Sequence, residues 1–110
     1  HVAKEMEKLL VKIYCDQSIT LLFPKLVSSV QLVARDENEY HILDINTNKI
    51  YAVIERNEQN ILAYCNGLTR VGDLLTLFEN THAGNEIIEF VRSLWRAKII
   101  ILKTGKTLFH

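Results

Sequence analysis

The spacing of hydrophobic and polar residues changes along the chain, and each change marks a predicted element. Residues 1–15 carry apolar side chains at helical spacing with lysines and glutamates between them, which predicts an amphipathic helix. Residues 16–24 fit either a strand or an apolar connector, and Pro24 interrupts both because it has no backbone N–H. The pattern leaves open whether the first helix packs on its own domain or on another one.

From residue 27 the spacing becomes two, which is typical of half-buried strands. Polar turns separate the predicted strands, and asparagines in the second turn tolerate a left-handed backbone. In the third strand we expect Ile50, Ala52 and Ile54 to share one face, opposite Tyr51, Val53 and Glu55. The pattern therefore predicts an antiparallel meander, with strands at 30–35, 40–45 and 50–55 and turns at 36–39 and 46–49.

After residue 56 the spacing becomes 3.6, which predicts three short helices. We expect Asn57, Thr69 and Asn85 to cap their starts, and Asn66-Gly67 to end the first of them. A β-branched strand at 99–102 and a turn at Thr104-Gly105 lead into 106–109, which would complete a hairpin.

The predicted fold class is α+β. It consists of a three-stranded antiparallel meander followed by a three-helix winged-helix-like bundle, with an extra N-terminal helix and a C-terminal hairpin. We divide the chain into residues 1–26, the helix and connector, and residues 27–110, a winged-helix-like domain.

Composition narrows the function classes. The 110 residues suit one small domain, and 13 basic residues balance 13 acidic ones. The chain therefore has no net positive charge to attract nucleic acid, although this balance does not exclude a local basic patch. No apolar run reaches the roughly 20 residues that span a bilayer, and no signal-peptide pattern is seen. We therefore expect a cytoplasmic chain that has no membrane partner.

The reactive side chains are scattered. Cys15 and Cys65 lie far apart in the sequence, and we expect them to be reduced rather than bridged. The four histidines show no metal-ligand spacing. Cys65 lies at a helix end on an apolar face without a local histidine, which favours packing over catalysis. We therefore expect no enzyme activity and no cofactor.

Four stretches follow one another in the later part of the chain: IYAVIERN, EQNILAYCNG, LTRVGDLLTLF and NEIIEFVRSLWRAKIII. From Ile54 onward the sequence resembles the peptide chaperones of pyrroloquinoline quinone biosynthesis (PqqD-like proteins). Their relatives are the RiPP recognition elements, which bind the leaders of ribosomally made precursor peptides. The resemblance covers residues 30–102 and rests on the order of the four stretches. The chain departs from this pattern in its N-terminal helix and in Gly72 within the second helix.

The resemblance implies a function. Such domains bind a leader peptide as an extra strand beside the third strand and over the third helix (86–98), and they present it to a modifying enzyme, in trans or in the same chain. An edge strand has unpaired N–H and C=O groups that an extended peptide can satisfy. The expected peptide-binding residues are Lys49, Ile50, Tyr51, Ala52, Val53, Ile54, Ile88, Arg92, Trp95 and Arg96.

Several alternatives stay open from the sequence. Either Ile87, Val91 and Leu94 face the core while Ile88 and Trp95 line a groove, or the reverse holds, and Trp95 fits a ligand anchor as well as core. Arg92 and Arg96 could read an acidic peptide or pair with Glu89 on the same helix. Two other functions also remain: a winged-helix DNA-binding regulator, and a structural or dimerisation domain of a larger enzyme that forms a homodimer through its first helix.

Overall fold

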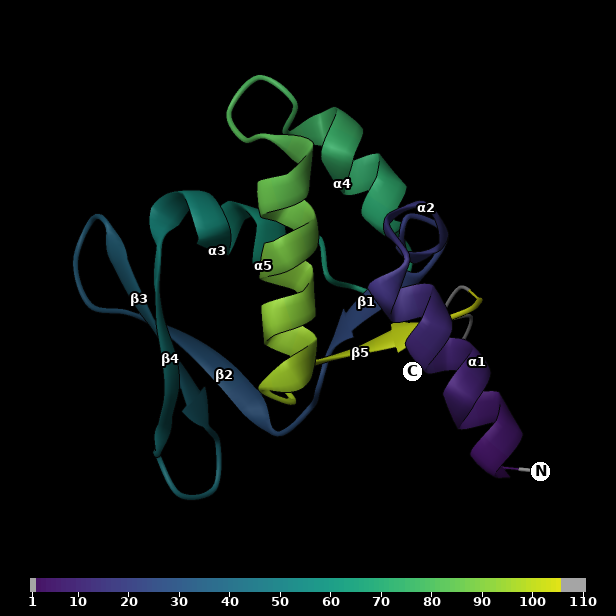
Figure 1. Cartoon of the computed structure of the whole chain (residues 1–110). Helices are drawn as coiled ribbons and strands as arrows, with labels where there is room; N and C mark the ends of the chain where they lie inside the picture. The colour runs from purple at the N-terminus through teal and green to yellow at the C-terminus, as the bar shows by residue number, and fades with distance from the viewer. Residues whose placement is uncertain (1, 106–110) are drawn as a thin grey trace.

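The computed structural model describes residues 2–105, with side chains from residue 7 onward. It confirms the α+β class (Figure 1). In chain order the elements are α1 (Val2–Tyr14), α2 (Asp16–Ile19), β1 (Phe23–Leu26), β2 (Val30–Ala34), β3 (Glu39–Asp44), β4 (Ile50–Glu55), α3 (Arg56–Leu62), α4 (Val71–Leu77), α5 (Gly84–Arg96) and β5 (Ile100–Lys103).

The predicted meander is present as an antiparallel sheet in the order β2-β3-β4. The polar turn between β3 and β4 uses a left-handed backbone at Asn48, whose φ is 60°. This is the conformation that asparagine tolerates best after glycine. The sequence pattern therefore located these three strands and the turn that joins the last two.

A second sheet pairs β1 with β5. Residues 16–24, for which a strand or a connector was predicted, contain the short helix α2 and the start of β1. Pro24 lies inside β1 although it has no N–H to donate. Its carbonyl accepts the backbone N–H of Gly67 at 2.9 Å, so the Pro24 backbone faces residues 66–67 rather than β5. Only an isolated bridge, Lys25 with Asn66, forms on that side. Proline is tolerated there because no continuous ladder needs its N–H. The predicted hairpin partner, 106–109, lies outside the described residues.

The three helices after the sheet occupy the predicted places, but α3 and α5 begin two residues early and α4 begins one residue late. Their N-caps are Glu55, Arg70 and Ala83 rather than Asn57, Thr69 and Asn85. In the first two helices the backbone N–H of the N-cap residue donates to a carboxylate three residues later. Glu55 donates to Glu58, and Arg70 donates to Asp73. A side chain inside the first turn therefore fixes these starts, which outweighs the intrinsic preference for asparagine or threonine at the cap.

A single hydrophobic core joins both sheets and the helices. Ile13, Ile19 and Leu22 from the first 26 residues are buried in it beside Ile42, Val91 and other residues of the later segment. The N-terminal helix thus packs on its own domain. Gly72, a departure from the family pattern, allows α4 to approach this segment: its N–H bonds the Thr20 carbonyl at 2.9 Å, and a Cβ on Gly72 would lie 3.1 Å from that oxygen.

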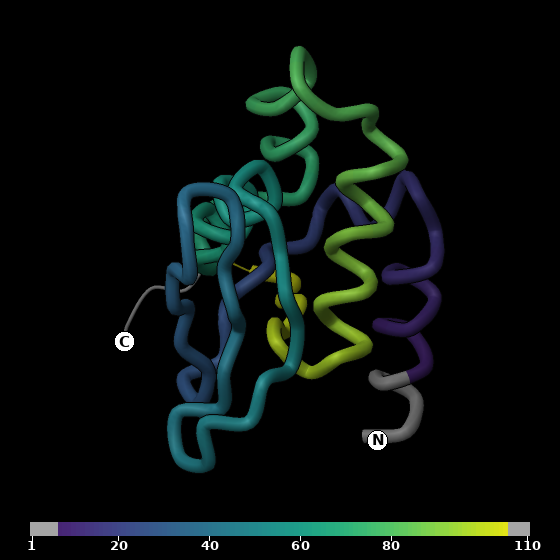
Figure 2. Tube along the Cα trace, turned by 90° about the vertical axis from the view of Figure 1, so that its left-hand side faces the viewer, coloured from purple at the N-terminus to yellow at the C-terminus, as the bar shows by residue number. Residues whose placement is uncertain are grey.

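Helix α5 lies between the three-stranded sheet and α1 (Figures 1 and 2). Arg92 on α5 is only 7% exposed and holds this arrangement. Its guanidinium donates at 2.8 Å each to the Ile13 carbonyl, the Asp16 carboxylate and the Glu89 carboxylate. The first two bonds reach the corner between α1 and α2, so one buried cation fastens the N-terminal segment to α5.

Replacing Arg92 by Ala is expected to lower the free energy of unfolding by about 2–4 kcal/mol, because bonds from a charged donor contribute roughly 1.5–3 kcal/mol each and the buried stem also packs. Arg96→Ala is the matched control. Arg96 is on the same helix, is exposed and lies 4.0 Å from the same Glu89, so its loss should change stability by no more than about 0.5 kcal/mol. Urea unfolding measures both values, and equal losses would contradict the role given to Arg92.

Candidate functional site

Strand β4 is an edge strand of the three-stranded sheet, and we call its unpaired side the β4 margin. It pairs with β3 on one side, and no strand within residues 2–105 pairs with it on the other. The N-terminal segment does not close this margin, because α1 lies across α5 from the sheet (Figure 2). An open margin presents backbone N–H and C=O groups to any extended chain that approaches.

The hydrogen bonds at the end of β4 identify which groups face outward. Arg56, the residue after the strand, donates its N–H to the Asn38 carbonyl at 3.1 Å, so it faces the β3 side. Successive residues of a strand point their backbone groups to opposite sides. Ala52 and Ile54 therefore face β3, whereas Val53 and Glu55 face the open side. A bond on the other side of β3 supports this assignment: the N–H of Arg35 donates to the carbonyl of Glu39. The Glu39 backbone therefore faces β2 and not Glu55, which stands opposite it on β4.

A β-bulge divides the open margin. Ala52 stands opposite Ile42, but Ile50 stands opposite the next residue, Leu43, so Tyr51 has no partner of its own. The expected alternation of Ile50, Ala52 and Ile54 on one face breaks here, and Ile50 is half exposed while Ile54 is buried. A guest strand with regular spacing can therefore pair along Ala52–Glu55, but the same register does not continue through the bulge.

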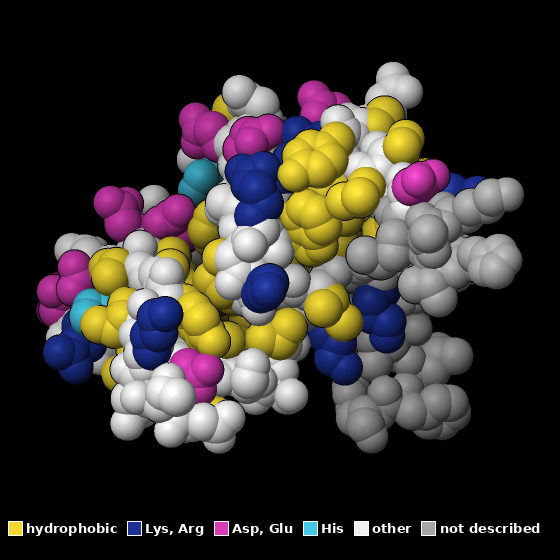
Figure 3. Space-filling view, turned by 60° about the horizontal axis from the view of Figure 1, so that its bottom comes forward, with side chains coloured by type: hydrophobic (Ala, Val, Ile, Leu, Met, Phe, Trp, Pro, Cys, Tyr) yellow, Lys and Arg dark blue, Asp and Glu magenta, His cyan; other side chains and the backbone are white. Residues whose placement is uncertain are grey.

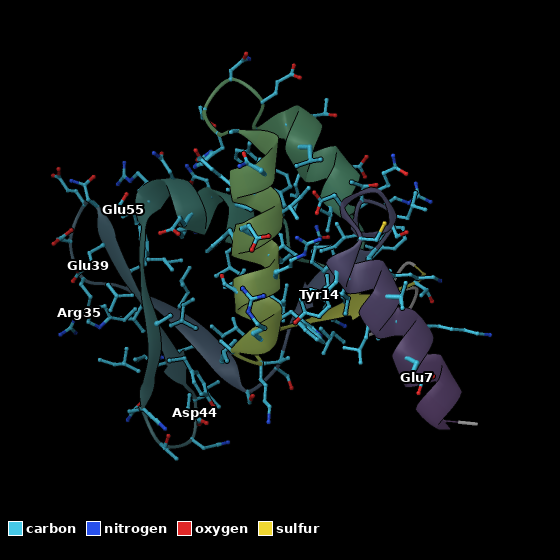
Figure 4. All side chains as sticks on the ribbon, viewed as in Figure 1. Glu7, Tyr14, Arg35, Glu39, Asp44 and Glu55 are labelled. Carbon is cyan, nitrogen blue, oxygen red and sulfur yellow. The ribbon has the colours of Figure 1, made fainter. Side chains whose placement is uncertain are left out.

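The side chain of Tyr51 fixes the bulge to the end of β3. Its hydroxyl donates to the Asp44 carboxylate at 2.8 Å, and the other carboxylate oxygen accepts the backbone N–H groups of Asn46 and Thr47. The bond from Tyr51 is the main cause that holds the pKa of Asp44 below its ordinary value, and the same bond raises the pKa of Tyr51. Figure 4 places Asp44 at the opposite end of the sheet from Glu55.

At its other end the margin meets an open, polar hollow of ≈ 750 Å³. The end of β4 and the start of α3 form one wall, and the turn between β2 and β3 forms the other. Figure 4 shows Glu55 where β4 passes into α3, with Glu39 on the neighbouring strand. The lining residues are Asp36, Asn38, Glu39, Val53, Ile54, Glu55, Arg56, Asn57 and Glu58.

The residues expected on α5 lie elsewhere. Arg92 bonds the corner between α1 and α2, and the ring of Trp95 packs edge-on against Tyr14 of α1 at 6.0 Å. Ile88, one turn before Arg92 on the same flank, is buried. Arg92 and Trp95 therefore contact the α1–α2 segment where a groove was expected. Ile87, Val91 and Leu94 are buried in the core, which agrees with the inward half of the first alternative, but Ile88 is buried as well.

The remaining expected residues divide in a simple way. Arg96 is exposed and lies near Glu89, which Arg92 also contacts, so the alternative of pairing within the helix is confirmed for both arginines. Lys49 lies in the turn just before β4.

Phe90, which was not among the expected site residues, is half-buried against the core. Phe90 lies about 200° from Arg92 around the helix, so it faces away from α1. A helical projection of the sequence gives this angle, but the side that faces α1 follows only from the position of α1.

Among residues 7–105 the cysteines, histidines and carboxylates form no group of three or more that is placed to hold a metal ion. Both cysteines are free thiols, and burial raises the pKa of Cys65 to about 12, which suits packing rather than nucleophilic attack. Among the described helices none is long and apolar enough to cross a bilayer.

Comparisons of the chain with models of protein families, with curated proteins and with solved structures found no match.

Hydrogen exchange measured residue by residue tests the open margin. The Val53 amide is expected to exchange faster than those of Ala52 and Ile54, because the two neighbours bond β3 and Val53 does not. The Glu55 amide should be partly protected, because the Glu58 carboxylate accepts it at 3.0 Å. Equal protection of Val53 and Ile54 would contradict the assigned direction of the backbone groups.

Tyr51→Phe is expected to raise the pKa of Asp44 toward the ordinary value of about 3.9, because the bonding hydroxyl is lost. A carboxyl group whose pKa is lowered by folding stabilises the folded state at pH values above its unfolded-state pKa. This stabilisation is lost as the pH falls through the folded-state pKa. Wild type should therefore be more stable than the variant above about pH 4, with the difference fading in stronger acid. Carboxyl NMR titration measures the shift, with Tyr64→Phe as control; an unmoved Asp44 would refute it.

Proposed function

We propose that this chain is a peptide-recognition module. It binds an extended segment, the leader of a ribosomally made precursor peptide, by strand addition along β4, and it presents that peptide to a modifying enzyme in trans or in the same polypeptide. The protein itself carries out no chemistry. The observation that carries the proposal is the unpaired margin of β4, where the N–H and C=O groups of Val53 face away from β3.

The side chains along this margin support the proposal. Val53 is 53% exposed and Ile50 is 50% exposed, so apolar surface lies beside the open backbone groups. At the opposite margin of the sheet, Gln31 and Ala34 are the exposed residues of β2, and Arg35, also exposed, follows the strand. Backbone pairing gives affinity for any extended chain, and apolar contacts between side chains add to it. The β4 margin therefore suits a guest strand better than the β2 margin.

The DNA-binding alternative needs cations on the helix that enters a groove of the duplex. On α5 the guanidinium of Arg92 is buried and bonded within the protein, and Arg96 lies near Glu89. On the face in Figure 3 the lysine and arginine side chains are spread over several places and do not form one continuous basic patch. These features favour peptide recognition over nucleic acid.

The dimerisation alternative is favoured by one feature of α1. Leu10, Val11 and Tyr14 expose apolar side chains on this helix, with exposed fractions of 39%, 68% and 55%. This surface lies on the other side of α5 from β4 (Figure 1), so it is compatible with a peptide at the margin. A contact made by α1 with an enzyme domain or a second copy would leave the β4 margin free.

Selection from a random-peptide phage library on the whole chain tests the proposal, and it does not require the natural ligand to be identified first. Peptides are expected to enrich, and Val53→Pro should weaken them at least about tenfold, because it removes an outward N–H and blocks the approach of a strand. The substitution should leave the fold intact, because that N–H does not bond β3.

Ala34→Pro is the matched control, because the Ala34 backbone faces the open side of β2 by the same alternation. It should leave peptide affinity unchanged. Failure to enrich any peptide over a blank surface, or equal binding to wild type and to Val53→Pro, would overturn the proposed function. Loss of binding only in Ala34→Pro would move the site to the wrong margin and would overturn it as well.

A further inference from the structure

The regular part of the β4 margin offers few backbone groups, and one of them is already bonded. Between the bulge at Tyr51 and the start of α3, only Val53 and Glu55 face outward. The Glu55 N–H donates to a carboxylate oxygen of Glu58 at 3.0 Å. In the free protein, Val53 is therefore the residue of this stretch whose N–H stands ready for a guest.

A guest strand that extends past Val53 needs the bonded group. In an antiparallel ladder, Val53 exchanges both of its bonds with one guest residue and Glu55 does so with another two positions away. In a parallel ladder, the N–H of Glu55 takes a guest carbonyl in the same way. In both directions the guest carbonyl competes with the Glu58 carboxylate for one proton donor.

The surroundings allow Glu58 to leave. Its side chain is half-buried rather than enclosed, and Glu58 and Glu55 both line the polar hollow beside the end of β4. A carboxylate turned into this hollow would be hydrated, so its release does not strand a charge in the core. The bond to be broken has an ionised acceptor, which makes it a stronger competitor than a neutral carbonyl.

We propose that Glu58 limits the affinity of this site by occupying the Glu55 N–H, and that full pairing of a guest strand along β4 displaces it. The inference rests on the proposed function, since it needs a guest at the β4 margin. It also gives the site a selectivity: a segment must offer a well-placed carbonyl and several further contacts before it replaces the carboxylate, whereas a short or irregular one pairs at Val53 alone.

The test uses peptides recovered from the random library and titrates them against three forms of the whole chain. Glu58→Ala leaves the Glu55 N–H free and is expected to bind about threefold to tenfold more tightly, which corresponds to one hydrogen bond. Glu58→Gln keeps a side-chain carbonyl that can cap the same N–H, so its affinity should lie closer to wild type than to Glu58→Ala. Loss of the cap lowers stability, but lower stability cannot by itself tighten binding.

A ligand-free measurement accompanies the titration. The Glu55 amide should exchange faster in Glu58→Ala than in Glu58→Gln or wild type. Unchanged exchange, or affinity in Glu58→Ala equal to or weaker than wild type, would overturn the role of Glu58. The Val53→Pro variant separates the two levels: peptides that lose binding to Val53→Pro yet ignore Glu58→Ala refute only the inference about Glu58, whereas peptides that ignore Val53→Pro refute the proposed function itself.

Discussion

Every backbone N–H and C=O group needs a partner, and in a three-stranded sheet the outer strands cannot satisfy this need from within. In this protein the outer strands are β2 and β4, and β4 shows how the constraint is met. One side of the strand is bonded to β3, and the other is interrupted by a bulge at Tyr51 and capped at Glu55. A β-bulge is one of the devices by which proteins limit unwanted pairing at an edge, and the Glu58 carboxylate occupies one further outward N–H. Val53, which lies between them, keeps groups available to a partner.

The arrangement of the helices keeps this margin accessible. Helix α1 buries Ile13 in the shared core, and Arg92 of α5 bonds the carbonyl of that same residue. Both contacts draw the N-terminal segment to the flank of α5 away from the sheet (Figure 1). The buried arginine therefore helps to hold α1 in a position from which the helix does not cover β4.

Much of the fold could be predicted because the apolar spacing follows the local geometry of strands and helices. The three strands and three later helices appear where residues 30–96 predict them. The strand that contains Pro24 was harder to predict. A strand tolerates proline only where no neighbouring strand needs its N–H, and this depends on which side of the residue the partner strand lies. The bulge at Tyr51 was hidden for another reason: every residue from Ile50 to Ile54 is apolar, so the sequence gives no sign of the irregular pairing.

Among the residues expected to bind a peptide, those of β4 lie on an unpaired edge, whereas Arg92 and Trp95 of α5 are engaged within the protein. A helix with a wide apolar surface offers two flanks, and its own sequence does not say which flank meets the sheet and which meets another helix. Trp95 and Arg92 looked suited to a ligand because one is large and aromatic and the other charged. They contact Tyr14 and the corner between α1 and α2 instead. Residues about 80 positions away decided the matter, and local patterns do not carry that information.

The central claim is that a guest strand pairs with β4 at Val53. The most direct measurement is isotope-edited NMR of the labelled chain with a selected peptide, which detects short cross-strand contacts between peptide backbone protons and the protein amides. The account predicts such contacts at the amides of Val53 and Glu55. Contacts confined to β2, to α1 or to the outer side of α4 would contradict it.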